Sequence, residues 1–349
     1  MTDKFTRRAF KTIAAAAIAA TSFTTPVVAE TTELIFNVFI PRPAPLYKHA
    51  LEPWARSVEE ASGGTLKINI PAASLAPPKK QFDIVQDGVA DISVVTVFFK
   101  RKKLTLDLIG SLPLIGATAE GASVAAWETH QKFFADKGQW KEFVPLALFS
   151  LGQPAILSGD GPITSSADLQ GFKVLATGKD KITTWRNLGA SPVGSDGLKP
   201  FEVVSSGVAD GVTIPLGTAV NQGLMPATKN VTVVPGGMGG RNVFALFISR
   251  DRFEALPEQA QKALTETAGV ELARKIGKIM DRIDGSGRKK FEDKGIAVQE
   301  ASPEFIDEIN AASNFMFDDW MAAAEAAGVD GAAAIEYFKE VAGASAMSN

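Results

Sequence analysis

Short apolar runs alternate with helical stripes along the first third of the chain. The run Leu34–Ile40 predicts a buried strand, which the proline-rich segment 41–45 ends. The same reading predicts further strands at 65–70 and 90–97, and helices at 47–62 and 79–89. Strand, helix, strand, helix, strand is the order typical of an α/β fold.

A second series of the same kind begins near residue 146. It predicts strands at 146–157, 172–175, 211–214 and 244–249, with helices at 182–188 and 201–208. Two α/β lobes are therefore the natural interpretation of the chain. We identify no internal repeat in the sequence.

The pattern becomes helical after Pro257. Apolar residues at helical spacing predict one nearly continuous helix from Glu258 to about Lys294. Its ~37 residues would measure ~55 Å, long enough to run along both lobes. Gly285-Ser286-Gly287 is the place where such a helix can bend. Residues 303–342 predict two more helices, separated at Gly328.

These patterns divide the chain into six segments. We expect lobe I at 30–151, lobe II at 152–241, a strand returning to lobe I at 242–256, the long helix at 257–294, and helices that pack on the lobes at 295–349, all preceded by an export signal at 1–29.

The first 29 residues have the three zones of a signal peptide. The basic segment Thr6–Lys11 precedes the alanine-rich run Ile13–Ala20, and Val27-Val28-Ala29 suits signal peptidase. The order Thr-Arg-Arg-Ala-Phe-Lys is that of the twin-arginine export motif, and an ordinary secretory signal is the alternative. Either one places the mature protein outside the cytoplasm, and we expect a periplasmic protein.

Composition excludes several classes of site. The chain has no cysteine and two histidines, which excludes disulfides, thiolate nucleophiles and thiolate zinc sites. Without the first 29 residues, 32 basic and 38 acidic residues remain, so the mature chain carries about −6. This acidity argues against nucleic-acid binding.

Catalytic motifs are also missing from the sequence. No phosphate-binding loop is present, and the glycine-rich segment Gly236–Gly240 is not followed by an apolar helix. His49 and His130 do not form a hydrolytic triad in any spacing that we recognise. We therefore expect no enzyme, metal or cofactor. An exported two-lobed protein of this kind is best explained as a receptor that closes around a ligand.

Seven short segments of the sequence resemble motifs of one protein family, and they occur in the same order as in that family. The sequence Glu59-x2-Ser62-Gly63-Gly64-Thr65-Leu66-Lys67-Ile68 resembles the opening motif of the DctP-type solute-binding proteins of TRAP (tripartite ATP-independent periplasmic) transporters. Similar matches follow at 83–92, 112–114, 167–174, 188–193, 201–211 and 251–257.

The resemblance implies a fold, a function and partners. The fold would be an α/β, two-lobed periplasmic binding protein fold of type II-like topology, with a cleft between the lobes and a long helix that spans them. The protein would capture a small organic solute and deliver it to a sodium-driven permease made of a small and a large membrane subunit. The alternatives are a binding protein that serves a sensor or another transporter class and, as a weaker one, an exported enzyme.

The chain departs from the family at its ligand-binding positions. The arginine that clamps a substrate carboxylate in the family is Leu175 here, and the family's asparagine is Ile214. A second arginine that the family commonly has near Gln153 is also missing. The first and third strands end at Phe39 and Thr96, where sialic-acid members of the family have polar and acidic residues.

These changes leave two interpretations of the site. In one, apolar and aromatic side chains line it and a few polar groups orient the ligand. The apolar set would be Phe39, Phe98 or Phe99, Leu175, Trp185, Phe201 and Ile214, and the polar set Thr96, Gln153, Thr177 and Thr213. Trp185 and Phe201 have core packing as their alternative.

In the other interpretation, an arginine from elsewhere in the chain restores the carboxylate clamp. Arg42, in the loop after the first strand, is the first candidate, and Arg186 and Arg241 are the others. The sequence leaves open whether the ligand is an organic acid or an uncharged, aromatic or cationic solute.

Overall fold

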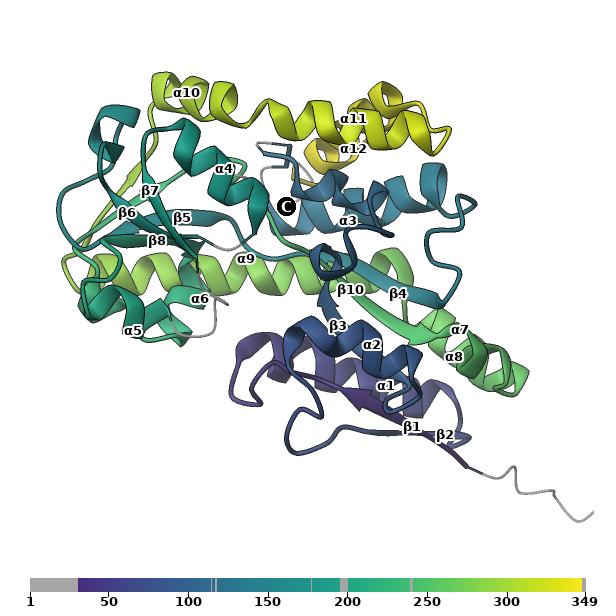
Figure 1. Ribbon diagram of the computed structural model, residues 1–349. Coiled ribbons are helices and arrows are strands. Elements are labelled where there is room, and N and C mark those ends of the chain that lie inside the picture. The colour runs from purple at the N-terminus through teal and green to yellow at the C-terminus, as the bar shows by residue number, and fades with distance from the viewer. Residues whose placement is uncertain are drawn as a thin grey trace, which may run out of the picture. The chain divides into compact units, whose positions relative to one another are not determined.

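The computed structural model of the protein describes residues 31–113, 115–116, 118–176, 178–194, 200–238 and 241–346 (Figure 1). The predicted signal peptide, Thr177 and the last two glycines of the segment Gly236–Gly240 lie outside these residues. Across the described ranges, every helix is too short or too polar to cross a membrane.

Two β-sheets organise the fold, and each combines parallel and antiparallel strand pairs. The first has the order β2-β1-β3-β10-β4, in which β1 is parallel to β2 and β3, and β10 is antiparallel to its neighbours. Its strands are β1 (Thr32–Asn37), β2 (Leu66–Asn69), β3 (Ile92–Thr96), β4 (Phe143–Ser150) and β10 (Val243–Ser249).

The second sheet has the order β7-β6-β8-β5-β9-β11, with β6 parallel to β7 and β8. Its strands are β5 (Pro154–Ser158), β6 (Lys173–Ala176), β7 (Ser191–Gly194), β8 (Gly211–Pro215), β9 (Asn230–Val233) and β11 (Ala297–Glu300). We call the first sheet with its helices lobe I and the second sheet with its helices lobe II.

Helices connect and cover both sheets. Around the first sheet they are η1 (Tyr47–Leu51), α1 (Glu52–Ala61), η2 (Pro78–Lys80), α2 (Gln81–Gln86), η3 (Val97–Lys100), η4 (Leu106–Ser111), α3 (Ala119–Thr129) and η5 (His130–Phe134). Around the second they are η6 (Ser166–Leu169), α4 (Lys179–Asn187), α5 (Pro200–Ser205), α6 (Leu216–Asn221) and η7 (Met225–Ala227). The later part of the chain forms α7 (Arg250–Glu254), α8 (Glu258–Glu266), α9 (Gly269–Asp293), α10 (Pro303–Ser313), α11 (Phe315–Ala326) and α12 (Gly331–Ala346).

Three expectations about these elements were wrong. The apolar run 146–157 is two strands, β4 and β5, which belong to different sheets. The helix expected at 258–294 is two helices that meet at Gly269, whose φ of +76° cannot continue a right-handed helix. Helix α9 instead runs without interruption through Gly285–Gly287, and residues 303–346 form three helices rather than two.

The two lobes share a repeat that the sequence analysis passed over. Gly88-Val89-Ala90-Asp91 links α2 to β3, and Gly207-Val208-Ala209-Asp210 links α5 to β8. In both, the glycine has positive φ (72° and 74°), the valine is about half exposed and the alanine is buried. Both aspartates accept a hydrogen bond from a backbone N–H of the adjacent parallel strand, Ile35 in one case (2.6 Å) and Lys173 in the other (2.8 Å). The unit therefore stops a helix and fixes the register of the next strand.

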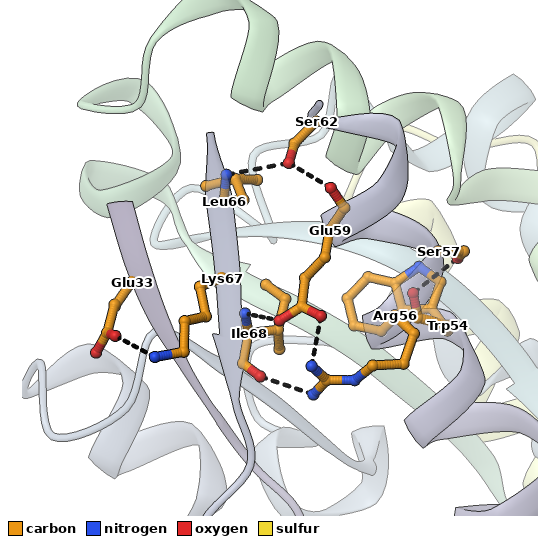
Figure 2. A network of polar contacts seen from close by, with 9 residues as sticks. All are labelled: Glu33, Trp54, Arg56, Ser57, Glu59, Ser62, Leu66, Lys67 and Ile68. Atoms are coloured by element: carbon orange, nitrogen blue, oxygen red, sulfur yellow. Dashed lines mark hydrogen bonds and ion pairs between the residues drawn. The ribbon is translucent and has the colours of Figure 1, made fainter. Parts of the chain in front are cut away.

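The opening motif of the chain has a structural role at the exposed edge of β2 (Figure 2). Glu59 accepts a hydrogen bond from the Ile68 N–H (2.7 Å), and Arg56, which pairs with Glu59, donates to the Ile68 carbonyl (2.8 Å). Ser62 accepts from the Leu66 N–H (3.0 Å). Side chains of α1 and its C-cap thus satisfy backbone groups that an edge strand would leave open.

Helix α9 contacts both lobes at very short range because glycines line the contacts (Figure 1). A Cβ atom at Gly277 would lie 2.4 Å from the Glu120 Cα at the start of α3. A Cβ atom at Gly287 would lie 2.6 Å from the Gly217 backbone nitrogen at the start of α6. Backbone therefore packs directly on backbone at both places, one in each lobe.

Two carboxylates on α9 complete these contacts. Asp281 accepts hydrogen bonds from the Ala119 N–H (2.7 Å) and the Glu120 N–H (2.9 Å), and so caps α3 in lobe I. Asp284 accepts from the Gly217 N–H (3.0 Å) and caps α6 in lobe II. Asp281 adds to the cap that Thr118 gives α3 by accepting from the Gly121 N–H (2.9 Å), whereas the N-cap residue of α6, Pro215, supplies no side-chain cap. The positive end of each helix dipole favours the negative charge of the acid beside it.

Alanine substitutions of two glycines in α9 should distinguish the effect of close packing on stability from the effect of helix propensity. We expect Gly287→Ala to lower the free energy of unfolding by about 1–3 kcal/mol, because the added methyl group meets the backbone of α6. Gly285→Ala has open space around the new methyl group and should raise the free energy of unfolding by about 0.5–1 kcal/mol. Urea denaturation of both variants measures the difference, and equal effects would contradict the packing argument.

The stability of the protein should depend on the protonation of Asp284. Burial raises the pKa of Asp284 to about 6, above the value near 3.9 expected in the unfolded chain. Because the folded state binds this proton more tightly, the stabilising contribution is complete below about pH 4 and is lost as the pH rises through 6. We expect Asp284→Asn, which cannot titrate, to remove a pH dependence of the order of 2 kcal/mol.

The measurement is the free energy of unfolding of both proteins from pH 4 to pH 7. The exposed Asp318, changed to Asn, is the matched control and should keep the wild-type slope. If Asp284→Asn also keeps that slope, the buried carboxyl group is not the source of the pH dependence.

Candidate functional site

The residues singled out in the sequence lie mainly where parallel strands end. Phe39 follows β1 and Thr96 is the last residue of β3, while Leu175 and Ile214 lie in the last two positions of β6 and β8. In open α/β sheets, the loops at the carboxyl ends of parallel strands form ligand sites. These residues therefore lie at the edge of each sheet where a ligand site of this kind would form.

On lobe I this edge is aromatic. The ring of Phe39 stacks on Phe244 at a centroid distance of 6.5 Å, and the centroid of the Phe149 ring lies 5.8 Å from that of Phe244. Thr96 pairs with Phe244 in the sheet, and its hydroxyl caps η3 by accepting from the Phe98 N–H (3.3 Å). The sequence analysis missed Phe244, because its strand lies far from β1 and β3 in the chain.

The two lobes touch at the start of α4. The ring of Phe98 lies so close to Gly178 that a Cβ atom there would be 2.9 Å from it. Arg101 of lobe I forms an ion pair with Asp180 of lobe II (3.0 Å), and its guanidinium lies 4.9 Å from the centre of the Phe98 ring. Phe98, rather than Phe99, is therefore the aromatic side chain at the contact. Phe99 is partly buried against the core of lobe I.

Within lobe II the candidate residues divide between the two faces of the sheet. Leu175 is buried, and with the partly buried Ile214 it belongs to the cluster that packs against α5, α6 and Phe291 of α9. Thr213 pairs with Ile156, so its side chain lies on the opposite face, toward the cluster that contains Trp185. One surface cannot present all of these residues to a ligand.

Other candidates fall outside any shared surface. Trp185 is 2% exposed, which matches the alternative of a core residue, whereas Phe201 on α5 is 40% exposed. Gln153 lies in the segment that connects β4 to β5, where it donates to the Val234 carbonyl. Thr177 lies outside the residues that the structure describes.

None of the three candidate arginines is placed to replace the missing clamp. Arg42 donates to the Ile70 carbonyl (3.1 Å) beside edge strand β2, and Arg186 is exposed on α4. Arg241 is buried, and it donates to the carbonyls of Gly116 (3.0 Å) and Leu151 (3.3 Å). Burial lowers the pKa of Arg241 to about 10. Its guanidinium joins the segments that connect the lobes.

The structure identifies a cation that the sequence analysis missed. Lys181 lies three and seven residues before the buried Thr184 and Leu188, on the inward stripe of α4. Lys181 is partly exposed as a residue, and the protein packed around its side chain lowers the pKa of Lys181 to about 8 through desolvation. A lysine on the apolar stripe of a predicted helix was the available signal, and the predicted helix began one residue too late to include it.

Polar groups elsewhere serve the fold. A cavity of about 810 Å³ lies between η1, α6 and the basic face of α9, and none of the candidate residues is among those that line it. His130 contacts Asp107 (2.9 Å), which also accepts from the Trp140 indole (2.6 Å), and all three side chains are buried in the core of lobe I. The described ranges contain no group of three or more side chains able to ligate a metal.

Solved structures with similar folds come from several bacteria. A TRAP periplasmic solute-binding protein from Bordetella bronchiseptica, solved with bound (R)- and (S)-mandelate, is 28% identical with a TM-score of 0.82, and the match covers 89% of this chain and 98% of that one. A TRAP solute-binding protein from a marine metagenome, solved with 3-hydroxybenzoate, is 29% identical with a TM-score of 0.80, over 90% and 98% of the two chains.

The sequence comparisons agree with the structural ones. A curated relative, the outer membrane transporter protein TsaT of Comamonas testosteroni, is 29% identical over 318 residues, which is 90% of this chain and 93% of the relative. Residues 36–323 match the model of bacterial extracellular solute-binding protein family 7, DctP. The fold is the two-lobed α/β fold expected from the sequence, and the family consists of solute receptors rather than enzymes. The chain belongs to the DctP family of extracellular solute-binding proteins of TRAP transporters.

Proposed function

We propose that this receptor captures an aromatic monocarboxylate outside the cytoplasm and delivers it to a TRAP permease with a small and a large membrane subunit. One observation carries the choice of ligand. The matches to the mandelate-binding and 3-hydroxybenzoate-binding relatives cover 89% and 90% of this chain, and both ligands combine one benzene ring with one carboxylate. The family membership supports the permease as partner.

The chemistry of the lobe contact agrees with such a ligand. Phe39, Phe244 and Phe98 place aromatic side chains at the carboxyl edge of the first sheet, and rings of this kind pack against a benzene ring by stacking or edge-to-face contact. Phe39, Phe98 and Thr96 in lobe I, with Thr213 in lobe II, are the residues of the original set that we retain for the site.

The bounds of the segments expected from the sequence form part of this proposal. We place lobe I at 30–151 and lobe II at 152–241, joined by the connections 151–153 and 234–242 and by α9. The 242–256 segment carries β10, which pairs with β3 and β4 in the first sheet. Closure of two lobes around a ligand is the mechanism that this arrangement supports.

A thermal-shift screen of the chain from Glu30 onward tests the ligand class. We expect mandelate and 3-hydroxybenzoate to raise the melting temperature by several degrees, because a ligand at ~100-fold its Kd stabilises the folded state by ~2.7 kcal/mol. The uncharged controls are mandelamide and 3-hydroxybenzamide, and pyroglutamate is the non-aromatic acid. A larger shift with pyroglutamate or with the amides than with the aromatic acids would contradict the proposal.

Export through the twin-arginine route is the second part of the proposal, and residues 6–11 support it. We expect Arg7→Lys combined with Arg8→Lys to keep the protein in the cytoplasm, because that route needs the arginine pair whereas an ordinary secretory signal needs only positive charge. Cell fractionation measures the distribution, and Lys4→Arg is the control. Normal export of the double variant, or of the wild type in a host without twin-arginine translocase, would indicate the ordinary route.

A further inference from the structure

We propose that Lys181, in the first turn of α4, binds the carboxylate of the ligand, and that the Thr213 hydroxyl gives it a second hydrogen bond. This inference rests on the proposed function for the aromatic part of the ligand, but the anion itself follows from the side chains of lobe II. The site lies at the start of α4, where Phe98 and Arg101 of lobe I meet lobe II.

The position of Lys181 is unfavourable unless an anion joins it. The residue shares the inward stripe of α4 with Thr184, Trp185 and Leu188, all of which are buried. Among the described residues, its ammonium group has no hydrogen-bond or ion-pair partner. The neighbouring carboxylate, that of Asp180, pairs with Arg101 instead. Burial is the cause of its lowered pKa, and no nearby carboxylate raises it again. A desolvated cation of this kind is stabilised by a carboxylate at hydrogen-bond distance.

The helix that carries Lys181 also favours an anion at the same end. Helix α4 has nine residues and begins after Gly178, which supplies no side-chain cap. The first turn of a helix exposes backbone N–H groups and the positive end of the helix dipole, which repels a cation and attracts an anion. A carboxylate placed here would accept hydrogen bonds from the backbone N–H groups of the first turn, and it would also neutralise the charge of Lys181.

Thr213 is the second, independent observation. Its hydroxyl oxygen is buried and has no hydrogen-bond partner among the described residues. Leu175 pairs with Val212, so Thr213 lies level with Ala176, the last residue of β6 before the loop that leads to α4. Its side chain is on the sheet face that α4 covers. A buried hydroxyl without a partner is costly, and a ligand oxygen would satisfy it.

The proposal accounts for the leucine at the family's arginine position. Leu175 lies on the opposite face of the sheet, in the cluster that contains Val212 and Phe291, so no charge is needed or accommodated there. The positive charge comes instead from the helix that follows the same strand, six residues later in the chain. Phe98, which covers the start of α4, would contact the ring of the ligand while Lys181 binds its carboxylate.

Isothermal titration calorimetry with 3-hydroxybenzoate and 3-hydroxybenzamide tests the anchor. We expect Lys181→Met to weaken binding of the acid by about 10–100-fold, the loss typical of a charge-assisted hydrogen bond, and to leave binding of the amide within about twofold. Lys179→Met is the matched control, because Lys179 is exposed in the same helical turn. It should bind both compounds as the wild type does.

A substitution of Thr213 gives a readout that does not depend on the lysine variants folding. Thr213→Val removes a hydroxyl for which the described part of the chain offers no partner, so the free protein should melt at the wild-type temperature or above it. Binding of the acid should nevertheless weaken by about 3–10-fold. If Lys181→Met and Lys181→Gln both fail to fold by circular dichroism, unchanged binding by Thr213→Val overturns the proposal.

The outcomes of these titrations distinguish the proposed role of Lys181 from the proposal that the ligand is an aromatic acid. If the wild type binds a non-aromatic carboxylate instead, the aromatic proposal fails, and the same variants titrated with that acid test the anchor. If the wild type binds an acid and Lys181→Met binds it equally well, the anchor fails and the ligand class stands. If the wild type binds the amides and no acid, both fail.

Discussion

The arrangement of this protein depends on how closely α9 approaches the two lobes. Glycines at the contacts let the helix backbone lie against the starts of α3 and α6, where any side chain would overlap backbone atoms. Asp281 and Asp284, three residues apart on one helix, then cap those two helices. Because α9 caps one helix in each lobe, it is a common support for both lobes, and any movement of one lobe relative to the other starts from this support. The connections 151–153 and 234–242 complete the junction, and Arg241 ties them together through backbone carbonyls.

The charges at this junction are buried, and that has a consequence for how it responds to its environment. Burial raises the pKa of Asp284 and Asp281 and lowers that of Arg241, although attraction between the acids and the arginine opposes each shift. Desolvation is thus the largest effect in all three cases. Such a group of charges therefore contributes less to stability than the number of its contacts suggests, because the cost of burying the charges offsets their attraction.

The two lobes use the same solution for their parallel strands but different chemistry at the ends of those strands. In each lobe, a glycine with positive φ follows a helix, and the aspartate immediately before the next strand accepts a hydrogen bond from the neighbouring parallel strand. The loops beyond these strands are free of that constraint. Near these strand ends, lobe I carries phenylalanines, whereas lobe II carries a lysine of lowered pKa in α4 and, in β8, a buried hydroxyl that has no partner among the described residues. An aromatic wall facing an anion-seeking helix start is complementary to a ligand with one ring and one carboxylate.

The sequence by itself determined the α/β class, the two series of strands and helices, and the strand ends at which a site would form. It did so because hydrophobic periodicity and turn residues are local properties of the chain. It also determined the family, through motifs such as Glu59–Gly64 whose side chains bind backbone within a few residues. Only the tertiary structure decided which side chains share a surface. Leu175 and Thr213 lie on opposite faces because strand pairing sets them there, and Phe244 reaches Phe39 because β10 returns to the first sheet. Lys181 became visible only when burial and the absence of a partner among the described residues could be seen, since desolvation depends on every element around a charge and not on its neighbours in sequence.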